Sequence, residues 1–401
     1  MRRRQLSFLF LNIGHFLDHF FLLIFATVAA LRLTTEWGLS YAELIPYATP
    51  GFVAFGICAI PAGWLADKWS REGMMVIFFV GIGASSLFAS LASTPLEIGI
   101  SLTLVGIFAA IYHPVGLAMV IQGRSKTGVP LAINGIFGNM GVASAALLTG
   151  LLIDTVGWRS AFLIPGMAAV IFGMLYLVFV RTGQKDESAE GPTPSTIAEP
   201  DVHRKSLGRV FAVIFITTAI GGLIFQSTTF TLPKVFEERL TDLAGTATLV
   251  GSYVFGVFAV AAFAQLVVGY LVDNHSIRTV FASVAILQAA FLAIMMQVTG
   301  VEALIVAIAF MLVVFGQIPI NDVLVGRMAH SEWRSRAYAL RYIITFSVMA
   351  SAVPLIAWIH GAWGFDALFG LLAVAAFLIF VAVLFLPRSP DSQQNASQSA
   401  V

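Results

Sequence analysis

Charged residues are scarce in this chain. Only 11% of its 401 residues are Asp, Glu, Lys or Arg, whereas a water-soluble domain carries about 25%. Hydrophobic residues make up 59%, and the mean hydropathy is +0.91. The formal net charge of +1 gives no reason to expect nucleic acid as a partner. The composition therefore predicts an integral membrane protein with the lipid bilayer as its surroundings.

Cysteine and several sequence motifs are also scarce. The single cysteine, Cys58, excludes an internal disulfide. The sequence has no Gly-x-x-x-x-Gly-Lys-Ser/Thr phosphate loop, so ATP hydrolysis of that type is excluded. It has no Ser/His/Asp arrangement typical of hydrolases, and His15 and His19 alone are a weak metal-binding signal inside a membrane helix. We therefore expect neither an enzyme nor a bound cofactor or metal.

Twelve apolar stretches are long enough to cross a hydrocarbon core of ~30 Å as helices, at about 1.5 Å per residue. Lipid offers backbone groups no water to bind, so each is predicted to be helical. The predicted fold is all-α, with twelve transmembrane helices at 6–31, 42–65, 74–93, 98–121, 129–153, 160–180, 207–232, 247–271, 279–299, 303–326, 337–360 and 365–386.

The distribution of Lys and Arg predicts the orientation. With a cytoplasmic N-terminus, all but four of the 22 basic residues lie on the cytoplasmic side, the exceptions being Arg32, Arg159, Lys234 and Arg239. Both termini are therefore expected in the cytoplasm of a cell (inner) membrane protein. The basic Arg2-Arg3-Arg4 start leads into a full-length span without a cleavage site, so we expect this span to be retained.

The chain is predicted to consist of two similar halves. Residues 182–206 are polar and contain three prolines, which indicates a flexible linker between an N-terminal bundle, 1–181, and a C-terminal bundle, 207–387. Residues 388–401, rich in Ser and Gln, are expected to be disordered. Gly63-Trp-Leu-Ala-Asp67 recurs as Gly269-Tyr-Leu-Val-Asp273, a shift of 206 residues. The same shift places Gly157 on Trp363, a weaker echo. Duplicated six-helix units are a common transporter architecture.

The first apolar segment contains three ionisable residues near its middle: His15, Asp18 and His19. Their spacings of three and four place them on one helix face. A carboxylate at that depth costs several kcal/mol unless it pairs, takes a proton or meets water, so such groups are functional candidates. We predict that Asp18 couples transport to protons and that both histidines tune it. The alternative is a polar cluster that only fixes helix packing.

The spacing Gly63-x-Leu65-x-Asp67-Lys68-x-x-Arg71 resembles the cytoplasmic loop motif of the major facilitator superfamily. Its degenerate repeat ends in Arg278, and the resemblance covers nearly the whole chain. It implies two pseudo-symmetric six-helix bundles and a cytoplasmic gate that holds that side closed while the cavity faces outward. The gate residues are then Gly63, Asp67, Lys68, Arg71, Gly269, Asp273 and Arg278.

A narrower resemblance is to the fosmidomycin-resistance branch of that superfamily. It is carried by His15, by Tyr112-His113-Pro114, and by Gly128, Phe137, Gly138, Asn139 and Gly141. The branch has Asn-Asp where this chain has Asp18-His19. It also has an acid and an Arg after His-Pro, where this chain has Val115 and Ala118. The loss of both charges argues against a phosphonate substrate.

Other polar residues within the spans are candidates for a substrate cavity, because the family's first, fourth, seventh and tenth helices line it. We expect His113 to face the Asp18 cluster from slightly off the midplane, and Tyr112 to be a cavity wall or plain core. Glycine spacing in the fifth segment predicts close helix packing, and Asp322 is expected to pair with Arg327 or Arg341. The predicted cavity residues are Tyr112, His113, Asn134, Gln226, Gln317 and Asn321.

These observations predict a monomeric secondary transporter that exports a small organic compound in exchange for protons. Few charges remain in the predicted cavity, which favours a hydrophobic or weakly amphipathic substrate over a polyanion. Two alternatives stay open. The first is a proton-coupled uptake symporter for a metabolite, and the second is a transporter-like sensor without net flux.

Overall fold

The computed structural model describes residues 3–124, 127–183, 204–328 and 331–387, with side chains omitted at 204–207, 322, 325–328 and 331–343. Most of the predicted linker, 182–206, and the whole predicted tail, 388–401, lie outside these residues. The described residues are helical and contain no β-strand. They form two compact units, which are described separately.

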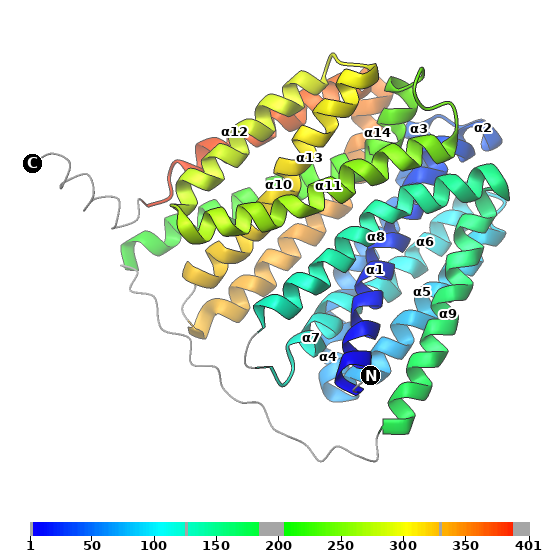
Figure 1. Ribbon diagram of the computed structural model, residues 1–401, viewed down its shortest axis with the longest axis horizontal. Helices are drawn as coiled ribbons and strands as arrows, with labels where there is room; N and C mark the ends of the chain where they lie inside the picture. Colours follow the sequence, from blue (N-terminus) through cyan, green and yellow to red (C-terminus); the bar gives the residue numbers. More distant parts are fainter. Residues whose placement is uncertain (1–2, 125–126, 184–203, 329–330, 388–401) are drawn as a thin grey trace, which may run out of the picture. The chain divides into compact units, whose positions relative to one another are not determined.

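Unit 1 comprises Met1–Thr196, Thr229–Ala259 and Ala350–Ala362. Its helices α1 and α8 pack side by side, and α5 packs against α9 (Figure 1). The N-terminal elements are α1 Arg3–Val28, η1 Ala29–Leu33, α2 Thr34–Trp37, α3 Tyr41–Leu44, η2 Ile45–Ala48, α4 Thr49–Lys68, α5 Arg71–Leu91, α6 Pro95–Ala109, η3 Tyr112–Gly116, α7 Leu117–Ile121, α8 Gly128–Thr155 and α9 Trp158–Gly183.

Unit 2 comprises Ile197–Thr228, Val260–Met349 and Trp363–Val401. Within it α12 packs against α13. The C-terminal helices, three of which contribute one segment to unit 1, are α10 Arg204–Arg239, α11 Ala247–Asn274, α12 Ile277–Met295, α13 Gly300–Met328 and α14 Ser331–Val383. The predicted division into bundles 1–181 and 207–387 stays a prediction.

Eleven helices among the described residues are long and apolar enough to cross a membrane. The last of them, residues 344–383, contains Gly364, whose φ of 73° and ψ of −171° are not helical, so two helices meet there. Counting these two separately gives the twelve predicted segments. Large apolar side chains of these helices, such as Ile57, Trp64 and Phe263, are exposed, which is typical of helices that cross a membrane.

Helix starts follow local sequence signals. Ser70 and Thr94 lie just before α5 and α6, and each accepts a hydrogen bond from the backbone N–H three residues later, at Gly73 and Glu97. These hydroxyls satisfy N–H groups that the first helical turn leaves without partners. These caps set the observed starts of α5 and α6 at Arg71 and Pro95, three residues before the predicted ones.

The weaker echo between the two halves is shifted by one residue from its predicted register. Gly157 and Gly364 both have positive φ, 113° and 73°, and each directly precedes the last helix of its half. Glycine adopts this conformation without steric cost. The structural equivalence is thus Gly157 with Gly364, a shift of 207, in place of Gly157 with Trp363.

Close backbone contacts set the packing of unit 1. A Cβ added at Gly106 on α6 would collide with the backbone carbonyl of Gly51 on α4. Small residues at such positions let membrane helices approach closely.

We expect Gly106→Ala to lower the free energy of unfolding by about 1–3 kcal/mol, the usual cost of overpacking. Thermal unfolding in detergent measures the change. Gly135→Ala on α8 is the matched control, because nothing lies within 4 Å of a Cβ added there. Equal stability of the two variants would contradict the close α4–α6 contact.

Candidate coupling and substrate site

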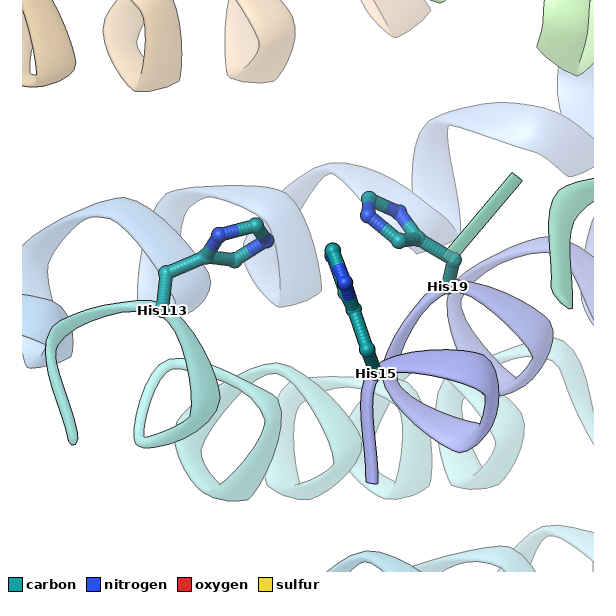
Figure 2. A group of neighbouring side chains, drawn as sticks. All are labelled: His15, His19 and His113. Carbon is teal, nitrogen blue, oxygen red and sulfur yellow. The ribbon is translucent and has the colours of Figure 1, made fainter. Parts of the chain in front are cut away.

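Four ionisable side chains meet inside unit 1: His15, Asp18 and His19 from α1 and His113 from η3. The imidazole centroids of His15 and His19 are 5.0 Å apart. The centroid of the His113 ring lies 5.4 Å from that of His15 and 5.5 Å from that of His19. Figure 2 shows the three rings turned toward one another, His113 reaching across from the opposite element. The prediction that His113 faces the Asp18 cluster is confirmed.

Asp18 is fully buried, and its nearest charged partner is His113. The distance between Asp18 Oδ2 and His113 Nε2 is 3.4 Å, and the His113 side chain is 18% exposed. Within the described residues neither carboxylate oxygen accepts a hydrogen bond. A buried carboxylate with so few partners is costly. It is stabilised when a proton is shared with or placed on the neighbouring imidazole.

The chain presents His113 at a local irregularity of the helix. Tyr112–Gly116 forms a π-helical turn, η3, between α6 and α7. Pro114 has no N–H, so it cannot donate to the preceding turn, and this loss loosens the α-helix. Single π-turns inside helices are frequent at functional sites. A Cβ added at Gly63 on α4 would lie 3.3 Å from Pro114 Cβ, so the glycine of the loop motif lets α4 approach this turn.

A hydrogen-bonded network holds His15. Its Nδ1 lies 2.8 Å from the backbone carbonyl oxygen of Asn134 on α8, and because a carbonyl only accepts, this nitrogen donates. Tyr112 stacks on the His15 ring at a centroid distance of 4.8 Å. The Tyr112 hydroxyl donates to the backbone oxygen of Leu11 at 2.7 Å. Asn134 Nδ2 donates to Asn12 Oδ1 at 2.9 Å. Because Nδ1 of His15 is held by Asn134, the other ring nitrogen, Nε2, is the one left for further contacts.

Glycines on α8 make room for this arrangement. A Cβ added at Gly138 would lie 2.7 Å from His15 Nε2, and one at Gly141 would collide with the backbone oxygen of Phe16. Gly135, by contrast, has nothing within 4 Å. The prediction of close packing along the fifth segment is therefore confirmed for Gly138 and Gly141.

Two predicted cavity residues lie in the core of unit 1, which for Tyr112 is the second of the two expected positions. Tyr112 and Asn134 are both completely buried, and their polar atoms bind each other and α1. They support the histidine cluster and are part of the core. Asn12, which also belongs to the network, was not predicted as a site residue. Its position three residues before His15, on the same helix face, is the signal that would have found it.

The remaining cavity candidates lie in unit 2. Asn321 on α13 accepts a hydrogen bond at 3.1 Å from the Thr217 hydroxyl on α10. Gln317, one turn earlier on α13, and Gln226 on α10 are both buried. The predicted pairing of Asp322 with Arg327 or Arg341 involves side chains outside the described ones.

The predicted gate residues form a pair in unit 1. Arg71 Nη2 donates to Asp67 Oδ1 at 2.8 Å, with the Asp67 side chain 66% and the Arg71 side chain 37% exposed and Lys68 exposed beside them. An exposed pair of this kind adds about 0–1 kcal/mol to stability. In unit 2, Gly269 has nothing within 4 Å of an added Cβ, Asp273 is exposed and Arg278 is half-buried.

A cavity of about 660 Å³ in unit 1 contains none of the predicted site residues. Glu36 in its lining accepts hydrogen bonds from Trp158 Nε1 at 2.9 Å and from Arg159 Nη1 at 3.3 Å. Asp154, also in the lining, accepts from the backbone N–H of Thr248 at 2.7 Å. Both carboxylates of this cavity thus already accept hydrogen bonds from the protein, so the cavity offers no open polar group that would indicate a substrate.

His113 also adds a third potential metal ligand to His15 and His19. One ring nitrogen from each of the three lies within 4.8 Å of the others. Zinc–nitrogen bonds are about 2.0–2.1 Å long, so a zinc ion would require the rings to move closer together. The expectation of no bound metal stays a prediction.

Long apolar helices that enclose a buried cluster of ionisable groups define a multi-pass membrane protein of the kind found among secondary transporters. The sequence model of the Major Facilitator Superfamily matches residues 11–241 and 238–400. The chain belongs to this family. Since its members are transporters, the prediction that the chain is not an enzyme is confirmed, as is the predicted all-helical fold.

The sequence is similar to curated transporters over part of their length. It is 24% identical over 283 residues to the gallate transporter of Pseudomonas putida, covering 63% of this chain and 62% of that protein. It is 22% identical over 279 residues to the 4-hydroxybenzoate transporter PcaK of the same species, covering 62% and 61%. It is 23% identical over 279 residues to the D-galactonate transporter of Escherichia coli O6:H1, covering 64% of each. The chain thus spans less than two thirds of these relatives.

Two solved structures share the fold over nearly the whole chain. An inward-facing, unoccupied bacterial homolog of the human lysosomal transporter Spinster matches with a TM-score of 0.72 at 15% identity, covering 96% of this chain and 95% of that one. A POT family transporter in complex with 5-aminolevulinic acid matches with a TM-score of 0.76 at 12% identity, covering 94% of each. The relatives named here are not described as fosmidomycin-resistance proteins, so that branch stays a prediction.

If the three imidazoles exchange protons and hold no metal, chelation with EDTA should leave substrate flux in proteoliposomes unchanged. The reason is that none of the expected steps requires a metal ligand. Flux should be measured before and after chelation and again after added Zn²⁺. Loss of flux with EDTA and recovery with Zn²⁺ in the wild type would show that the histidines hold a metal.

Proposed function

We propose that this chain is a secondary active transporter that moves a small organic compound by alternating access and is driven by protons. Membership of the Major Facilitator Superfamily and the similarity to three named transporters support the general activity. The buried pair of Asp18 and His113, 3.4 Å apart, carries the proposal of proton coupling.

The proposed substrate is a small organic acid. The similar transporters are named for gallate, 4-hydroxybenzoate and D-galactonate, all of which are hydroxy acids. A monoanion fits a chain with few charges inside its spans better than a polyanion does, since a polyanion requires several cationic partners. Hydroxy acids are therefore the first compounds to test.

Asp18 and His113 form a proton site that joins two elements, α1 and η3. Protonation of either group changes the charge of the pair, so the pair is suited to take up and release a proton. His15 and His19 lie against His113, so the protons bound belong to the whole cluster. His113, which the sequence assigned to the substrate cavity, is thereby proposed to take part in coupling as well.

The proposal includes the predicted orientation, with both termini in the cytoplasm of a monomeric inner-membrane protein, and export as the direction. An uptake symporter would accumulate substrate with the inward proton gradient, and a sensor would show no net flux. Purified protein in proteoliposomes, with the pH gradient imposed in either direction, distinguishes the three.

Asp18→Asn should abolish transport driven by a pH gradient and leave substrate binding intact, because the amide mimics the protonated carboxyl but cannot release a proton. His113→Gln should give the same defect, since it removes the partner of Asp18. The measurements are gradient-driven flux and equilibrium substrate binding.

The matched controls are Asp242→Asn, in an exposed loop, and His275→Gln, also exposed; both should transport normally. Wild-type accumulation by Asp18→Asn would refute the assignment of Asp18. A His113→Gln variant with normal coupling but altered substrate preference would return His113 to a role in the cavity alone.

The Asp67–Arg71 pair is proposed as part of the cytoplasmic gate. Asp67→Ala should reduce turnover severalfold while changing the free energy of unfolding by less than about 1 kcal/mol, because the pair is exposed. Flux and thermal unfolding measure the two effects. Glu72→Ala, at a neighbouring exposed carboxylate, is the control. Normal turnover in Asp67→Ala would count against the gate.

A further inference from the structure

Gln317 on α13 is a buried amide without a protein partner among the described residues. Its exposure is 4%, and neither Nε2 nor Oε1 makes a hydrogen bond. Burying an amide in this way is unfavourable unless something satisfies it. Packing alone therefore does not explain a glutamine at this position, where leucine would fill the same space.

The neighbouring turn of the same helix provides a comparison. Asn321 lies four residues beyond Gln317, and its amide oxygen accepts from the Thr217 hydroxyl on α10 at 3.1 Å. Gln317 faces Gly221, where an added Cβ would lie 2.5 Å from Nε2. The two contacts show that α10 and α13 run antiparallel along the line where they meet, the α10–α13 seam. On this seam the Asn321 amide is hydrogen-bonded and the Gln317 amide is not.

Thr218, directly after the paired Thr217, adds a second open group on α10. Its hydroxyl is buried at 4% exposure and has no hydrogen-bond partner among the described residues. Thr218 and Gly221 are three residues apart and so share a helix face, the face that meets Gln317. The amide and the hydroxyl together offer donors and acceptors on one seam.

The seam is also nearly free of charge. From Gly208 to Thr228 the only charged residue of α10 is Arg209, and from Gly300 to Asn321 the only one of α13 is Glu302. Both lie more than two helical turns from the open groups. Asp322 is five residues from Gln317, a spacing that does not share a helix face. The described side chains of α10 and α13 thus offer no charged partner beside the open groups, which favours a neutral ligand group that both donates and accepts hydrogen bonds.

We infer that Thr218 and Gln317 form a subsite for a neutral alcohol or phenol hydroxyl of the transported compound. The inference rests on the proposed transport function and narrows its substrate to hydroxylated compounds. Because Gly221 has no side chain, the Gln317 amide occupies the space beside it. This position of the amide determines where the hydroxyl of the ligand binds.

The test compares matched pairs of compounds that differ in one hydroxyl: 4-hydroxybenzoate with benzoate, and D-galactonate with its monodeoxy analogues. Half-saturating concentrations are measured for wild-type flux in proteoliposomes. We expect the hydroxylated member of the transported pair to be favoured about tenfold or more, since a polar site left unsatisfied rejects the analogue that lacks the group. Gln317→Leu and Thr218→Val should reduce this ratio to near one.

Thr217→Val is the matched control, because it makes the same change one residue away in the hydroxyl that is already paired with Asn321. It should lower thermal stability and keep the wild-type preference. Gln317→Leu should not lower the unfolding temperature of the ligand-free protein, because it removes an unsatisfied amide. It should, however, abolish the rise in unfolding temperature that 4-hydroxybenzoate or D-galactonate causes in the wild type.

Three outcomes overturn the inference. If the wild type transports both members of each pair with the same half-saturating concentration, the hydroxyl subsite is refuted and the proposed transport function is not affected. A lower unfolding temperature of ligand-free Gln317→Leu shows that the amide has a structural partner. Absence of flux for every compound refutes transport of hydroxy acids, and the subsite falls with it.

Discussion

The buried carboxylate of Asp18 is the constraint on which the rest of unit 1 depends. A carboxylate at the middle of a membrane helix is costly unless it pairs, takes a proton or meets water, and here the neighbouring ionisable group is His113, which lies 95 residues later in the sequence. To bring the imidazole there, the helix interrupts its regular hydrogen bonding at η3, α8 carries glycines where α1 approaches, and Tyr112 and Asn134 hold His15 in place. Each of these features imposes a local cost that isolated helices would avoid.

The fold could be predicted from the sequence because hydrocarbon permits few backbone structures. Twelve apolar stretches of sufficient length leave little choice but helices, and the observed boundaries follow caps such as Ser70 and Thr94. The face shared by His15, Asp18 and His19 followed from the periodicity of a regular helix. The one-residue shift between Gly157 and Gly364 did not, because backbone conformation, and not residue identity, defines that equivalence.

The site was harder to predict wherever helices meet. Spacing within α1 cannot show that His113 contacts Asp18, since that contact depends on the π-turn and on the approach of α4 at Gly63. Tyr112 and Asn134 have the polarity expected of cavity residues, yet their hydrogen bonds are made within the core. Conversely, Gln317 and Asn321 look alike in sequence and differ only because Thr217 pairs with one of them.

The glycines of α4 have a mechanical consequence. Gly51 touches α6 through its backbone oxygen at Gly106, so no flexible side chain separates the two helices there. Near its other end, beside Asp67, α4 touches Pro114 at Gly63. Helix α4 therefore joins the Asp67–Arg71 pair to the turn that carries His113 through close glycine contacts, and Pro61, which removes one helical hydrogen bond between those contacts, is the point at which its two ends can bend relative to each other.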